Sequence, residues 1–144
     1  MEPIIYTASV MWSQLDVNRH LRHSAYADFA TQARLELLNQ NGLSIERMAE
    51  LNLGPVLFRE ESNYHREISA TDTIQVSCLL RRARKDGSRW AFEQKIYRGD
   101  GVLAATIYVE GAWLHLQHRK LTQLPQPLAE AFHRLDRTPD FEWQ

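Results

Sequence analysis

The fold is decided by Leu15-Asp16-Val17-Asn18-Arg19-His20-Leu21-Arg22-His23-Ser24-Ala25-Tyr26, where a polar loop runs directly into an amphipathic helix. Ser24 is the expected N-cap, and the cluster Asn39-Gln40-Asn41-Gly42 ends the helix. Apolar side chains recur between them at helical spacing: Tyr26, Phe29, Ala30, Ala33, Leu37 and Leu38. An apolar stripe of this width needs a sheet to cover it.

The rest of the chain predicts that sheet. The pattern has period two over most of residues 56–116, with tight turns at Asp86-Gly87 and Gly99-Asp100-Gly101. The expected strands cover residues 4–12, 56–68, 73–84, 90–96 and 102–116. Gly111 is a candidate β-bulge. Two short helices are expected, one over residues 44–51 and one that Pro125 and Pro127 open, and the tail beyond residue 137 is expected to be loosely held.

This order of elements predicts an α+β fold in which one long helix packs on an antiparallel sheet of about five strands. The sequence has no internal repeat and no linker, so residues 1–144 are expected to form a single domain. The predicted strands are longer than the usual five or six residues. Such an excess of pairing surface favours a homo-oligomer, a dimer or a tetramer, with sheets joined edge to edge.

Composition excludes several classes of function. The formal net charge is −1, so no field of one sign points to nucleic acid or to an anionic membrane. The only basic run is residues 81–85, which is either a solvated strand end or a phosphate-binding patch. The single Cys78 lies among apolar residues and is expected to be a buried, inert thiol. With no signal-peptide pattern and no bilayer-spanning segment, a cytoplasmic protein without membrane insertion is expected.

Taken together, three blocks of sequence resemble the hotdog-fold acyl thioesterases, in particular the 4-hydroxybenzoyl-CoA thioesterase-like and long-chain acyl-CoA thioesterase group. The first block is Asp16-Val17-Asn18-Arg19-His20 followed by Tyr26 at the helix start. The second is Asn63-Tyr64-His65-Arg66 with Asp72-Thr73-Ile74, and the third runs from Ala104 through Trp113 to Pro125. The resemblance covers nearly the whole chain in the right order. It implies a hotdog fold and hydrolysis of acyl-CoA or acyl carrier protein thioesters.

The resemblance also implies roles for the residues of the loop. Asp16 would act as base or nucleophile, and the backbone N–H of His23 would polarise the thioester carbonyl. Asn18 and His20 would orient Asp16 or a water molecule, although each is equally explained as a hydrogen bonder that stabilises the loop. Judged by position alone, Asp16 is a turn-holding acid.

The expected substrate-binding residues are Tyr26, Glu67, Arg82 and Arg84. Tyr26 is core or acyl-tunnel lining, Glu67 is a second carboxylate or a strand residue at a dimer edge, and the two arginines would meet phosphates. No third ligand accompanies His20 and His23 at a convincing spacing, so neither a metal nor another cofactor is expected.

Two departures from the family pattern stand out, and two other functions compete with hydrolysis. Arg22-His23 stands where many relatives carry two asparagines, and Glu67 stands where many carry proline. A non-catalytic protein that binds acyl thioesters is one alternative, because a fold does not guarantee activity. An enoyl thioester hydratase is the other, but relatives of that kind have a longer spacing than Asn18-Arg19-His20.

Overall fold

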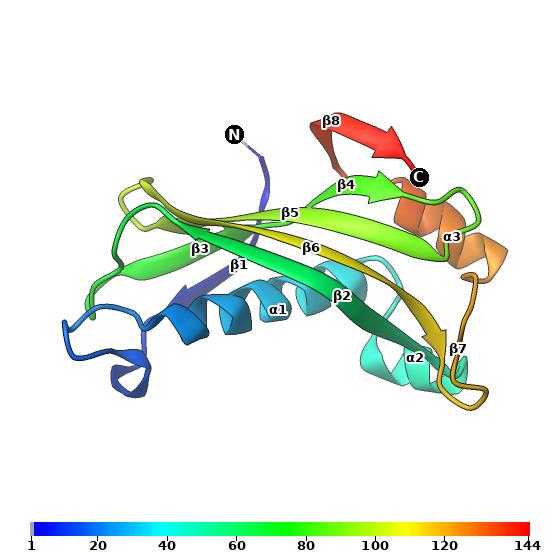
Figure 1. Cartoon of the computed structure of the whole chain (residues 1–144), viewed down its shortest axis with the longest axis horizontal. Coiled ribbons are helices and arrows are strands. Elements are labelled where there is room, and N and C mark those ends of the chain that lie inside the picture. The colour runs from blue at the N-terminus through cyan, green and yellow to red at the C-terminus, as the bar shows by residue number, and fades with distance from the viewer. Residues whose placement is uncertain (1) are drawn as a thin grey trace.

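The computed structural model describes residues 2–144, in which one eight-stranded sheet curls around a long helix (Figure 1). The helices are α1 (His23–Gln40), α2 (Ile45–Glu50) and α3 (Gln126–His133), with a single 3-10 turn at Trp12–Gln14. The strands are β1 (Ile4–Ser9), β2 (Leu53–Tyr64), β3 (Thr73–Ser77), β4 (Leu79–Ala83), β5 (Arg89–Arg98), β6 (Leu103–His115), β7 (Lys120–Leu121) and β8 (Arg137–Trp143). This arrangement fits the expected α+β hotdog fold.

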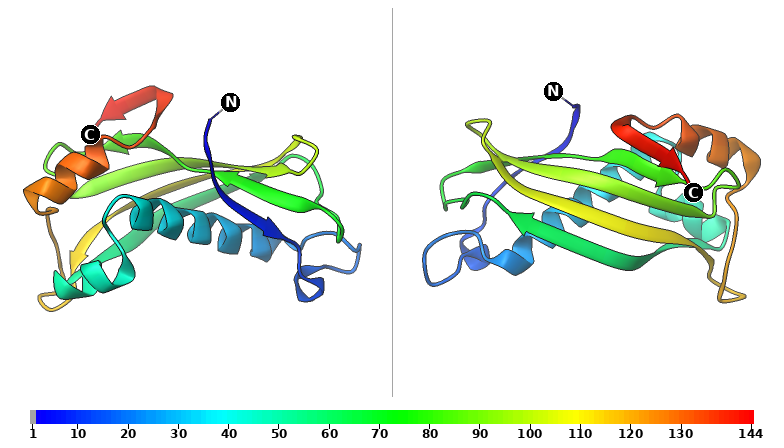
Figure 2. Two further views of the ribbon diagram at one scale, coloured as in Figure 1. Left: turned by 180° about the vertical axis from the view of Figure 1, so that it is seen from behind. Right: turned by 45° about the horizontal axis from the view of Figure 1, so that its top comes forward.

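The sheet is built on the antiparallel pair β5 and β6. One edge of β5 pairs with β3 and β4 in succession, and β6 continues to β2. Figure 2 shows α1 lying along the concave face that these strands form. The helix buries the expected stripe: Ala25, Tyr26, Phe29, Ala30, Ala33, Leu37 and Leu38. The predicted N-cap is wrong by two residues, because α1 starts at His23 with Arg22 at the N-cap position.

The sheet has more strands than the sequence predicts. The expected strand over residues 73–84 is interrupted at Cys78, which divides it into β3 and β4. The tail was expected to be loosely held, but β8 pairs with β4 in parallel and Phe141 packs on the core. Alternation of polar and apolar residues detects a strand with one buried face, whereas β8 is largely exposed and has no such pattern.

Gly111 lies at an irregularity of the sheet, but the bulge is on the neighbouring strand. Phe58 is the extra residue, because Leu57 pairs with Gly111 and Arg59 pairs with Glu110. A side chain at Gly111 would overlap the carbonyl oxygen of Val56 and the ring of Trp90. Glycine is therefore required here by the close approach of both Val56 and Trp90.

One other expectation can be checked against the fold. Cys78 is buried as expected, and burial raises the pKa of its thiol to about 12, which disfavours the reactive thiolate. Across residues 2–144, helices that are both long and apolar enough to span a bilayer are absent.

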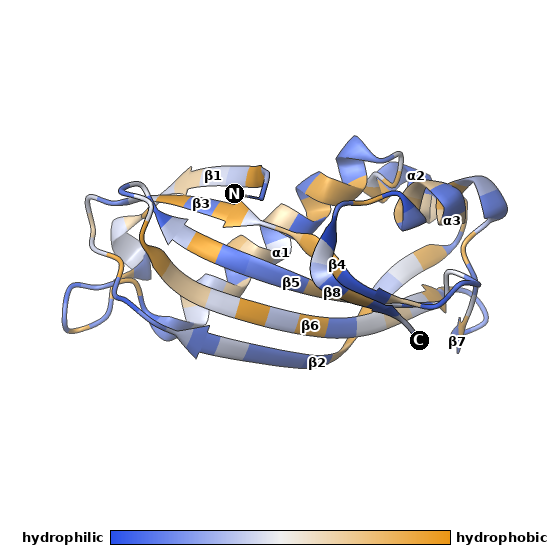
Figure 3. Ribbon diagram, turned by 90° about the horizontal axis from the view of Figure 1, so that it is seen from above, coloured by the Kyte–Doolittle hydropathy of each residue, from blue (hydrophilic) through white to orange (hydrophobic). Residues whose placement is uncertain are grey.

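Figure 3 shows that β2, at one edge of the sheet, is polar along much of its length.

Candidate active site

Asp16 holds the loop that precedes α1. Its Oδ1 atom accepts hydrogen bonds from the backbone N–H groups of Asn18 (2.8 Å) and His20 (3.2 Å). Arg19 takes a positive φ of 62° in this tight loop, and the backbone N–H of Asp16 donates to the carbonyl of His20. The carboxylate is exposed, and within residues 2–144 its Oδ2 atom has no hydrogen-bond partner. One oxygen therefore maintains the loop while the other remains free.

The loop delivers the chain to the start of α1. Leu21 is buried and its N–H donates to the carbonyl of Ile68, which fixes the loop against the segment after β2. Arg22 donates from its guanidinium to the Ser13 carbonyl and to Ser24 Oγ, so its side chain does not cap the helix. In the described chain, the N–H groups of His23 and Ser24 have no partner. Unpaired N–H groups at a helix start attract negative charge.

A cavity of about 330 Å³ joins these elements. The cavity is lined by the loop, the first turn of α1, and the end of β2 with the segment after it. The lining residues are Asp16, His20, Leu21, His23, Tyr26, Tyr64, His65, Arg66 and Glu67. Five of the eight residues expected from the sequence are therefore brought together: Asp16, His20, His23, Tyr26 and Glu67. Asn18 stays in the loop beside Asp16 and does not line the cavity.

Tyr64 and His65 were given no role from the sequence. The Tyr64 ring packs edge-on against Tyr26 at 5.0 Å between centroids, and its hydroxyl donates to the carbonyl of His23. The His65 ring is hydrogen-bonded to Thr106 through Nε2 (3.0 Å). The periodicity of the sequence does not predict that Tyr64 and His65 line the cavity, because it does not show that the end of β2 lies beside the start of α1.

Tyr26 is buried at the wall of the cavity near negative charge. Burial raises the pKa of its phenol, and the neighbouring Tyr64, Asp16 and Glu67 raise it further. Glu67 itself is exposed, and its carbonyl accepts a hydrogen bond from Arg98. The phenol of Tyr26 is therefore a neutral group beside two carboxylates.

Arg82 and Arg84 lie apart from this cavity. Arg82 is on β4 and pairs with Glu110 of β6. Arg82 is in register with Ala91 of β5 and Glu110 of β6. Side chains alternate between the two faces of a strand, and the preceding residues Trp90 and Val109 face α1. Arg82 therefore lies on the outer face of the sheet. Arg84 is exposed and directly follows β4. Figure 1 shows that the end of β4 lies at the opposite end of the molecule from the loop before α1. Neither side chain lines the cavity.

The residues of the cavity suit acyl transfer more than metal chemistry. Groups of three or more His, Cys, Asp or Glu side chains that could hold a metal ion are absent from residues 2–144. Asp16, whose carboxylate has one oxygen without a partner, and His23, the first residue of α1, line one cavity instead. In general, a carboxylate can act as a base or nucleophile, and unpaired N–H groups at a helix start can stabilise an oxyanion.

Comparison with solved structures supports this fold. A hypothetical protein from Staphylococcus aureus, solved in complex with CoA, is 19% identical with a TM-score of 0.85 over 96% of this chain and 89% of its own. A DHNA-CoA thioesterase from Staphylococcus aureus is 19% identical with a TM-score of 0.82 over 90% of this chain and 87% of its own. A 1,4-dihydroxy-2-naphthoyl-CoA thioesterase from Synechocystis is 18% identical with a TM-score of 0.79 over 94% of this chain and 98% of its own.

Comparison with protein-family models identifies the family of this chain, whereas the solved structures support its fold. No curated protein sequence matches this chain. The family model of the thioesterase-like superfamily matches residues 10–132, which include the Asp16 loop, α1 and every residue that lines the cavity. The match confirms the resemblance drawn from the sequence and the expected class of enzyme, a thioester hydrolase. The chain belongs to the thioesterase-like superfamily.

Proposed function

We propose that this protein hydrolyses acyl-CoA thioesters in the cavity around Asp16. The observation that carries the proposal is the shared cavity, which is lined both by Asp16, with one carboxylate oxygen without a partner, and by His23 at the start of α1. The structural neighbour solved in complex with CoA supports CoA as the thiol carrier. Acyl carrier protein is the alternative carrier, and the same chemistry would serve it.

Asp16 would begin the reaction in one of two ways. As a base, it takes a proton from water while the water oxygen attacks the thioester carbonyl. As a nucleophile, it attacks the carbonyl directly and forms a mixed anhydride, which water then cleaves. In both cases the N–H groups of His23 and Ser24 would stabilise the oxyanion, and the CoA thiolate leaves. Tyr26 and Tyr64 would hold the helix start at the right distance from the loop.

We expect a second copy of the chain to pair with this one along the outer edge of β2. Among the strands of residues 2–144, this strand pairs with β6 alone, so its outer edge has free N–H and C=O groups. Leu57 and Phe58 are exposed on it. If two β2 strands pair in antiparallel orientation, the Tyr64 end of one strand lies against the Leu53 end of the other. The Tyr64 end is the one beside the Asp16 cavity, so each cavity would lie next to the partner copy. We therefore expect a homodimer at least.

Thiol release from a panel of acyl-CoAs tests the proposed reaction. We expect release from at least one acyl chain, and a loss of roughly 10²- to 10⁴-fold in kcat for Asp16→Asn, the usual range for a general base. Asp28→Asn is the matched control, because Asp28 is an exposed acid on α1 outside the cavity. The control is expected to keep the wild-type rate.

Three results would contradict parts of the proposal. Absence of thiol release from every chain length would show that the protein is not an acyl-CoA hydrolase. A wild-type rate in Asp16→Asn would leave hydrolysis standing and remove Asp16 from it. Release that occurs only from acyl carrier protein substrates would identify the other carrier.

A further inference from the structure

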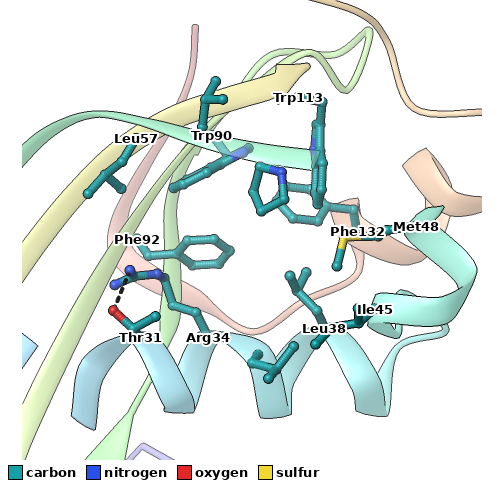
Figure 4. Close-up of a pocket in the computed structure, with 13 residues that line it drawn as sticks. Thr31, Arg34, Leu38, Ile45, Met48, Leu57, Trp90, Phe92, Trp113 and Phe132 are labelled. Carbon is teal, nitrogen blue, oxygen red and sulfur yellow. Dashed lines mark hydrogen bonds between the residues drawn. The ribbon is translucent and has the colours of Figure 1, made fainter. Parts of the chain in front are cut away.

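A second cavity, of about 390 Å³, lies between the C-terminal half of α1 and the sheet. Figure 4 shows that it is lined mainly by aromatic and aliphatic side chains from α1, α2, α3 and the strands β2, β5 and β6. Trp90, Phe92, Trp113 and Phe132 form its aromatic wall. It shares no lining residue with the Asp16 cavity. A volume of this size lies in the range of ligand pockets, roughly 300–1,000 Å³.

Among the described residues, Arg34 is the one charged side chain that lines this cavity. Its guanidinium donates to Gln94 Oε1 (2.8 Å) and to Thr31 Oγ1 (3.1 Å). Within residues 2–144 it forms no ion pair with a carboxylate. Burial lowers the pKa of Arg34, and Glu60 and Cys78 offset this only in part. Arg34 is partly buried, and a partly buried cation without an anionic partner favours a ligand that supplies one.

The rest of the lining is compatible with an anionic, largely apolar ligand. No Asp or Glu lines the cavity, and Thr31 is the only other polar aliphatic side chain there. The indole N–H groups of Trp90 and Trp113 have no partner among the described residues, but both are covered by protein and add no donor at the cavity surface. The cavity therefore offers an apolar body with one positive charge, on Arg34.

We propose that this cavity binds an apolar carboxylate, with its hydrocarbon or aryl body among the aromatic rings and its carboxylate on Arg34. A guanidinium forms strong, directional hydrogen bonds with a carboxylate. The same chemistry has two sources: a free carboxylic acid, or an acyl thioester whose chain ends in a second carboxylate. Only the second source rests on the proposed hydrolysis of acyl-CoA.

Calorimetry with two matched probes tests the site without any turnover. The probes are 3-phenylpropanoate and its uncharged amide, 3-phenylpropanamide. We expect the wild-type protein to bind the acid at least ~10-fold more tightly than the amide, the difference for one charge-assisted contact. Arg34→Met is expected to abolish this preference. Arg47→Met is the control, because Arg47 is an exposed arginine of α2 outside the cavity.

The location of the site is tested separately. Met48 lines the cavity, and Met48→Trp would fill part of it. We expect this variant to lose affinity for both probes by ~10-fold or more. Equal affinity of the wild-type protein for acid and amide would overturn the role of Arg34, even if Arg34→Met fails to fold. Unchanged binding in a folded Met48→Trp protein would overturn the location.

The two sources are separated by comparing suberoyl-CoA, which ends in a carboxylate, with octanoyl-CoA, which does not. If the distal carboxylate of a thioester is the ligand, Arg34→Met raises KM for suberoyl-CoA by ~10-fold and leaves KM for octanoyl-CoA unchanged. If a free acid is the ligand, both KM values change alike and the acid–amide preference persists in Asp16→Asn. Because calorimetry needs no catalysis, failure of the hydrolase proposal would not count against this site.

Discussion

Gln94 joins the helix to the sheet through Arg34. The Gln94 side chain is fully buried on β5, accepts a hydrogen bond from Arg34 (2.8 Å) and donates another to the carbonyl of Ala30 (2.8 Å). Both partners are on α1, so one amide satisfies a cation and a helix carbonyl in the core. A buried polar group of this kind stabilises a fold only while its partners are present.

Replacing Gln94 therefore should destabilise the protein. Gln94→Met keeps the size of the side chain but leaves the Arg34 guanidinium and the Ala30 carbonyl with one partner fewer each. We expect the free energy of unfolding in urea to fall by about 1–3 kcal/mol. Gln32→Met is the control, because Gln32 bonds only to Glu36 on the same helix. A Gln94→Met protein as stable as the control would show that the bridge contributes nothing.

Asp16 is expected to affect stability and activity separately. Asn at this position retains an oxygen that can accept from the N–H groups of Asn18 and His20, whereas Ala does not. Asp16→Ala should lower the free energy of unfolding by about 1 kcal/mol, similar to loss of a helix cap, and Asp16→Asn should change it little. Both variants should lose thiol release. Equal stability of Asp16→Ala and wild type would mean that the loop does not depend on this carboxylate.

The sequence predicts the helix and the central strands because each has one apolar face. The residues of α1, β5 and β6 were recognisable from spacing alone. β8 was missed, because it is largely exposed and adds to the edge of β4. An edge strand of this kind depends on a neighbour that is distant in sequence.

The candidate site was predictable only where a motif was continuous. The loop and the helix start are adjacent in sequence, so Asp16, His20, His23 and Tyr26 could be grouped before the fold was known. Tyr64 and His65 reach the cavity through the register of β2 with β6, which spacing does not reveal. The apolar cavity at Arg34 was not predicted for the same reason, since its walls come from six elements.

Glu2 is expected to make stability depend on pH. Burial acts to raise the Glu2 pKa, but hydrogen bonds from Tyr97 (2.7 Å) and Ser77, with the charge of Lys95, outweigh it and lower the pKa below 4.5. Because the folded-state pKa is lowered, its contribution is present above pH 4.5 and is lost as pH falls through the folded value. We expect Tyr97→Phe to cost about 1 kcal/mol at pH 7 and clearly less at pH 3. Urea unfolding at both values checks this, with Tyr6→Phe as control, and an equal cost at both values would contradict it.

Gly111 is expected to tolerate no side chain, because the atoms that it would meet cannot move aside. The obstacles are the backbone carbonyl of Val56 and the ring of the buried Trp90. Gly111→Ala should therefore lower the free energy of unfolding by about 1–3 kcal/mol, as overpacking of a core does. At Gly54 the added methyl would meet only the end of the Leu116 side chain, which is exposed and can rotate. Gly54→Ala is thus the matched control, and urea unfolding should give it the smaller loss. If the two variants lose the same free energy, the close approach of Val56 and Trp90 is not what requires glycine at position 111.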